Sequence, residues 1–105
     1  MITEKATVDE QTSLYNMLDA CLKAVRRRNV SYIIVAHTGS VATISLYVTG
    51  KKGMAAKDVV LLLDENTNVW SAYSQGYKYT LNSIMEITNI CKTIVNTLGA
   101  TVLKF

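Results

Sequence analysis

The sequence predicts an α+β domain in which two helices pack on one antiparallel sheet of four or five strands, in the order α-β-β-β-β-α-β. Two segments, one near each end of the chain, repeat apolar residues every three or four positions, as amphipathic helices do. Between them, runs rich in β-branched and aromatic residues alternate with turn-forming residues, as successive strands do. The 105 residues contain no internal repeat, linker or proline, so one domain over residues 1–105 is expected.

The first helix is expected after a loose N-terminus at residues 1–6. Thr7 and Glu10 have the spacing of a capping box, in which each side chain satisfies a free backbone N–H at the helix start. The helix should end near Arg28, because exposed carbonyl groups in a last turn favour positive charge there. Its apolar stripe is formed by Leu14, Leu18, Cys21, Leu22 and Val25.

Residues 30–49 are expected to form an antiparallel hairpin around a turn at residues 37–40. In the first strand Ile34 and Ile33 point to opposite faces, and both faces are largely apolar, which is typical of a central strand. The second strand alternates between a buried face and a more polar face that carries Tyr47. Because its strands are antiparallel, this hairpin brings the residues that precede it and those that follow it to the same end of the sheet.

A second hairpin is predicted from the apolar run Val59–Leu63, a polar turn at residues 64–68, and residues 69–74. Gln75 and Gly76 permit a bend, after which residues 77–79 extend the sheet briefly.

The last helix should begin near Ser83, which forms a second capping box with Glu86, and end at Gly99. Residues 100–105 are then expected to form a fifth strand, which either completes the sheet or pairs with another molecule.

The predicted topology collects basic residues at one end of the sheet. If each strand pairs with the next, the first helix ends and the first strand begins at one end, which we call the near end. Asp9, Glu10, Asp64 and Glu65 fall at the opposite, far end, so a net charge of +3 conceals a strongly dipolar molecule. The near end receives eight of the 11 lysines and arginines: Arg26, Arg27, Arg28, Lys51, Lys52, Lys57, Lys78 and Lys104.

Clustered basic residues attract polyanions through long-range electrostatics and counterion release. Aromatic side chains nearby can stack on bases, each contributing about 1–3 kcal/mol. The competing interpretation is that these aromatics serve strand packing and that the lysines are only solvated. The sequence therefore predicts a non-enzymatic binding module for an anionic partner, with single-stranded DNA or RNA first. The candidate stacking residues are Tyr47, Trp70, Tyr73 and Tyr77.

The alternative function is a protein-interaction module, such as an inhibitor, adaptor or homodimeric regulator, that docks on an acidic protein surface. Self-association would use a free sheet edge or the C-terminal strand. Salt-sensitive binding of generic oligonucleotides favours the first function, and a defined interface with one protein favours the second.

An enzyme is not expected, because the single histidine, His37, lies in a turn that offers no burial or orientation for a nucleophile and base. The glycines match no phosphate-binding pattern, and no cofactor or metal ligand set is present. Cys21 and Cys91 are predicted to be free buried thiols, which suits a cytoplasmic location. No apolar run approaches the length of about 20 residues that crosses a bilayer, and the N-terminus lacks a signal-peptide pattern, so no membrane partner is expected.

Overall fold

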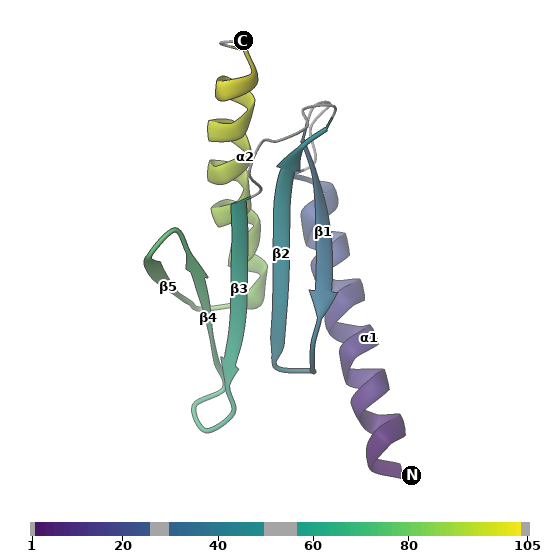
Figure 1. The fold of residues 1–105 in the computed structure, drawn as a ribbon. Coiled ribbons are helices and arrows are strands. Elements are labelled where there is room, and N and C mark those ends of the chain that lie inside the picture. The colour runs from purple at the N-terminus through teal and green to yellow at the C-terminus, as the bar shows by residue number, and fades with distance from the viewer. Residues whose placement is uncertain (1, 26–29, 50–56, 104–105) are drawn as a thin grey trace.

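The computed structural model describes residues 2–25, 30–49 and 57–103, and confirms a single α+β fold (Figure 1). Five strands form one antiparallel sheet in the order β1-β2-β3-β4-β5, so every strand pairs with its neighbour in the sequence. The elements are α1 (Ile2–Lys23), β1 (Val30–Ala36), β2 (Val41–Val48), β3 (Lys57–Asp64), β4 (Val69–Ser74), β5 (Tyr77–Leu81), the 3-10 helix η1 (Ile84–Glu86) and α2 (Ile87–Leu103).

The hairpin predicted over residues 30–49 is confirmed. Its register pairs Val30 with Val48 and Ala36 with Ala42. The β4–β5 hairpin closes through Gln75 and Gly76, both with positive φ (53° and 84°), as the tightest right-twisting hairpin turns require. The near end of the sheet therefore holds the starts of β1 and β3 and the end of β2. The shorter β4–β5 hairpin turns back before that end, because Tyr73 and Lys78 are level with Val60 in the middle of β3.

Both helices cover the same face of the sheet, which we call the inner face (Figure 1). Residues of α1 such as Leu18 and Leu22, and of α2 such as Ile87, meet Ile44 and Leu61 of the strands in one buried core. Each of these side chains is fully buried, which stabilises the fold by roughly 2 kcal/mol per side chain before entropy is counted. The other face of the sheet, the outer face, has no helix against it in the described part of the chain.

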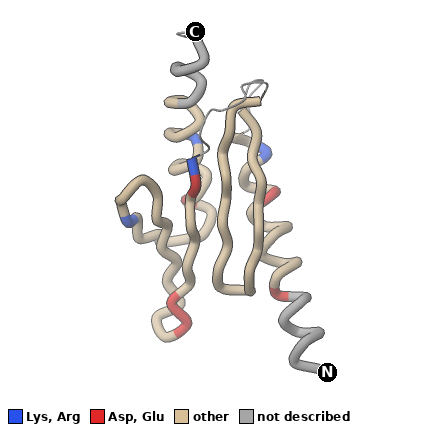
Figure 2. The backbone as a smooth tube through the Cα atoms, in the orientation of Figure 1, with Lys and Arg blue, Asp and Glu red and all other residues tan. Residues whose placement is uncertain are grey.

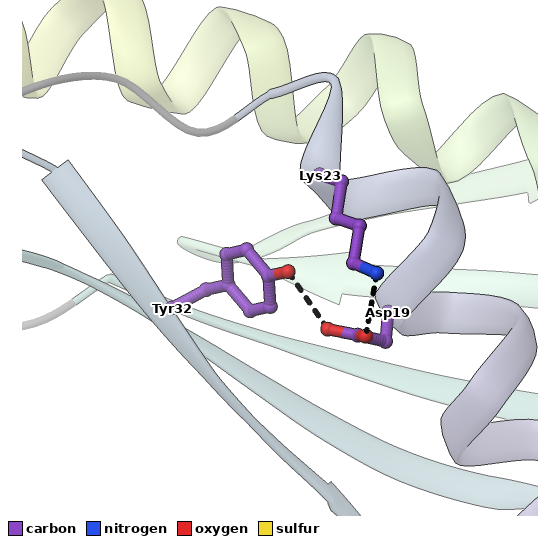
Figure 3. A network of polar contacts seen from close by, with 3 residues as sticks. All are labelled: Asp19, Lys23 and Tyr32. Carbon is purple, nitrogen blue, oxygen red and sulfur yellow. Dashed lines mark hydrogen bonds and ion pairs between the residues drawn. The ribbon is translucent and has the colours of Figure 1, made fainter.

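A polar contact fixes the end of α1 to the start of β1 (Figure 3). The Tyr32 hydroxyl donates a hydrogen bond of 2.8 Å to Asp19 Oδ1, and Lys23 Nζ lies 3.8 Å from Asp19 Oδ2. Tyr32 reaches α1 because it shares the inner face with Ile34, as the alternation in the sequence predicted. The contact places the last turns of α1 beside the near end of β1.

The helix boundaries differ from the predicted ones. α1 begins at Ile2 and ends at Lys23, rather than running from Thr7 to Arg28. Ser83 does cap the following helix, since the Met85 N–H donates to Ser83 Oγ at 3.3 Å. The strand predicted over residues 100–105 is wrong as far as residue 103, because α2 continues through Gly99 to Leu103. One glycine costs a helix only about 1 kcal/mol and does not have to end it.

The position of β1 corrects another prediction. Its two apolar faces indicated a central strand, but β1 is an edge strand of the sheet. Ile33 and Val35, on the outer face, remain 54% and 47% exposed. The residues expected as a short extension form the other edge, β5, so the fifth strand precedes α2 instead of following it.

Candidate binding surface at the near end of the sheet

Of the predicted basic residues, the structure describes Lys57, which lies at the near end, and Lys78, which lies level with Val60 midway along β3. Lys57 opens β3 opposite Leu46, and Lys78 follows the β4–β5 turn opposite Tyr73. Lys57 alternates with Val59 and therefore points to the inner face, whereas Lys78 points to the outer face. The two side chains thus lie on opposite faces of the sheet.

The other predicted basic residues lie outside the described residues: Arg26, Arg27, Arg28, Lys51, Lys52 and Lys104. The described residues that flank segments 26–29 and 50–56 belong to the near end. Val25 follows α1, Val30 opens β1 opposite Val48, and Lys57 opens β3. The two segments together contain three arginines, two lysines and no acidic residue.

Acidic residues lie at the far end, as predicted, and other acidic residues lie elsewhere along the chain (Figure 2). Asp64 closes β3 and Glu65 follows it, while Ser40 of the β1–β2 turn donates a 2.9 Å hydrogen bond to Glu65 Oε1. Glu10 of α1 passes so close to this turn that a Cβ on Gly39 would lie 2.7 Å from Glu10 Cβ. The far end therefore carries at least three carboxylates.

The near end also holds an acidic residue that the sequence argument left out. Asp58 follows Lys57 and points to the outer face, where its carboxylate accepts a 2.7 Å hydrogen bond from Ser45 Oγ. This exposed carboxylate reduces the positive potential on the outer face beside β3.

The predicted stacking residues do not share one face. Tyr47 and Tyr73 lie on the outer face, whereas Tyr77 and Tyr79 lie on the inner face of β5, with ring centroids 6.5 Å apart. Trp70 lies nearer the far end and packs against the core, where it lines a hollow with Leu14 and Gly39. Trp70 is thus placed as a packing residue.

Tyr73 and Lys78, level with Val60 in the middle of the sheet, form the one described pair that combines an aromatic ring with a basic group. The Lys78 ammonium lies 5.8 Å from the centroid of the Tyr73 ring. In such a pair, a base can stack on the exposed face or edge of the Tyr73 ring, and a neighbouring phosphate can bind the Lys78 ammonium.

The outer face is the feature that sequence reasoning missed. Register places Val35, Thr43, Val60, Tyr73 and Lys78 in one row across all five strands. Leu62 and Tyr73 are 38% and 37% exposed, so the apolar patch extends from β1 to β4. The alternation in β1 predicted that Ile33 and Val35 share one face of the sheet. Alternation alone cannot show whether another layer of the protein covers that face.

A cavity of about 300 Å³ lies on the inner face, between α2, the start of β3 and the β4–β5 hairpin. Lys57, Gln75 and Tyr79 line it from the sheet, and Asn89, Ile90 and Thr93 line it from α2. No local pattern in the sequence predicts this cavity, because its walls come from separate segments, at residue 57, residues 75–79 and residues 89–97.

No family model, curated protein or solved structure matches this chain. Within the described residues, neither helix combines the length and hydropathy needed to cross a membrane.

His37 and Ser40 each contact a different partner through their side chains. His37 Nε2 lies 3.0 Å from Thr43 Oγ1, and the Ser40 hydroxyl donates to Glu65, so the two residues do not form a nucleophile–base pair. Cys21 and Cys91 are free thiols. Burial, with a smaller contribution from neighbouring Cys21, raises the pKa of the Cys91 thiol to about 12, so it stays protonated and unreactive near neutral pH.

Proposed function

We propose that this chain is a non-enzymatic binding domain that recognises single-stranded nucleic acid at the near end of its sheet. The observation that supports it is the separation of charge along the strands. Lys57 lies at the near end, and the described residues there border segments 26–29 and 50–56, which contain five basic residues in the sequence, whereas Glu10, Asp64 and Glu65 lie at the far end. Asp58 is the acidic exception beside Lys57. A phosphate backbone is attracted to the first end and repelled from the second.

The described contacts add a base-binding element to this charge. Tyr73 and Lys78 lie side by side on the outer face, and Tyr47 lies on the same face two strands away. These rings are too far apart to stack adjacent bases, so binding relies chiefly on phosphate contacts and tolerates different sequences. Free cysteines fit a cytoplasmic setting for such a protein.

The test is a titration of a fluorescent single-stranded oligonucleotide at low and at physiological salt. We expect the double variant Lys51→Ala, Lys52→Ala to bind more weakly and to keep its thermal stability. The matched control is Lys5→Glu, which changes the net charge by the same two units within the first turns of α1. Absence of binding by the unmodified protein at low salt would exclude the nucleic-acid function.

A second candidate function, self-association, is supported by the open outer face. A two-fold axis running across the strands would stack two outer faces with their strands antiparallel, so that each near end meets the far end of the other copy. This arrangement is complementary in charge, whereas the parallel alternative would stack like charges.

The size of the outer face suits this arrangement. Five strands of this length span a flat area of about 500 Å². Because side chains project from the sheet, the solvent-accessible area is larger and approaches the roughly 800 Å² per partner of a standard interface. The apolar patch around Val35 and Leu62 would then be its centre. A protein that sediments as one chain at high concentration would rule out the dimer.

A further inference from the structure

The cavity on the inner face carries one positive group and no carboxylate among its described lining residues. Lys57 points into it because strand alternation sends Lys57 inward and Asp58 outward, where Asp58 is bonded to Ser45. The Lys57 side chain is half-buried, so its charge acts in a less polar setting than that of a surface lysine. An anionic group is therefore the complementary occupant.

The remaining walls suit a flat, partly polar ring. Tyr79 lines one side and Ile90 and Ile94 contribute apolar surface from α2. Gln75 and Asn89 each carry an amide, which presents one donor group and one acceptor and is the side-chain type that pairs with the edge of a base.

The Thr93 hydroxyl donates to the Asn89 carbonyl at 3.1 Å and so offers its oxygen as an acceptor. A volume of about 300 Å³ is at the lower limit of small-molecule sites and matches a single base with its sugar phosphate rather than a longer ligand.

The geometry points to a site for one nucleotide in this cavity: its base lies between Tyr79 and Ile90, and its phosphate contacts Lys57. The inference rests on the proposed function and deepens it, because Lys57 belongs both to the cavity and to the near end of the sheet. A strand bound at the near end would place one unstacked nucleotide on the inner face.

Adenosine 5′-monophosphate is the probe, and amide chemical shifts of the isotope-labelled protein report where it binds. We expect shifts at Gln75, Tyr79 and Asn89, and a loss of affinity of about tenfold in Lys57→Ala, the size of effect typical of a charge-assisted hydrogen bond. Lys92→Ala is the matched control, since Lys92 is exposed on α2 and does not line the cavity. Adenosine, which lacks the phosphate, should bind both variants equally.

The outcomes separate this inference from the proposed function. An oligonucleotide that binds while the mononucleotide shifts no cavity residue would overturn the cavity site and leave near-end binding intact. A mononucleotide that binds in the cavity without any oligonucleotide binding would support the site and reject the proposed function. Equal loss of affinity in Lys57→Ala and Lys92→Ala would mean that charge alone matters and would overturn the assigned position of the phosphate.

Discussion

Leu61 and Leu62 are neighbours on β3 and provide a matched test of the open outer face. Leu61 is fully buried on the inner face, whereas Leu62 is 38% exposed on the outer face. Replacing each by alanine removes the same atoms from opposite sides of one strand. The difference in unfolding free energy between the variants measures how the two faces are covered.

The expected magnitudes follow from burial. Leu61→Ala loses the transfer free energy of a buried side chain and leaves a cavity, so it should cost about 3–5 kcal/mol. Leu62→Ala leaves no enclosed cavity and forfeits only part of the roughly 2 kcal/mol of a fully buried leucine, so it should cost about 1 kcal/mol. Urea unfolding followed by Trp70 fluorescence, with unchanged slopes, gives both values.

Protein concentration separates the monomer from the proposed dimer. At about 1 µM the two costs should differ as stated; at about 100 µM association would stabilise the folded state and add to the cost of Leu62→Ala alone. An equal cost for both variants at low concentration would refute the open outer face. Concentration-independent costs would refute the dimer and leave the open face standing.

Two further predictions concern the pH dependence of stability and the β4–β5 turn. Folding raises the pKa of Cys91 from 9.0 to about 12. The protonated thiol therefore contributes fully to the free energy of unfolding below pH about 9, and this contribution is lost as the pH rises toward 12. The stability advantage of the unmodified protein over Cys91→Val should shrink by about 1.4 kcal/mol per pH unit above 9, and a constant difference up to pH 11 would contradict the assignment. Gly76→Ala should cost about 1 kcal/mol in urea unfolding despite the open space around it, because φ is +84°, and an unchanged stability would show that the turn adopts another conformation.

Local signals in the sequence were sufficient for the two predicted hairpins and their turns. Alternation over residues 30–49 and the glycine after Gln75 specify their conformations through contacts between near neighbours, and the Ser83 cap acts within its own turn. The order of the strands followed from pairing each with the next.

Features that depend on distant segments could not be predicted in this way. Nothing near Ile33 or Val35 in the sequence shows that both helices pack on the opposite face, which leaves these side chains exposed. The continuation of α2 past Gly99 was also not predicted, because a glycine permits a helix to end but does not require it.

The candidate site was predictable only in part. The position of Lys57 at the near end followed from the hairpins, but the placement of Lys78 on the opposite face and level with Val60 required the register. Trp70 was expected near the basic residues, yet its position in β4 places it toward the far end against the core.

The salt dependence of oligonucleotide binding tests the central claim most directly. For single strands, the logarithm of the binding constant falls against the logarithm of salt concentration with a slope of about −0.7 per phosphate contact. The double variant Lys51→Ala, Lys52→Ala should therefore reduce the steepness of this slope by about 1.4, while Lys5→Glu should leave it unchanged. Equal slopes for all three proteins, or no binding at low salt, would contradict nucleic-acid binding at the near end.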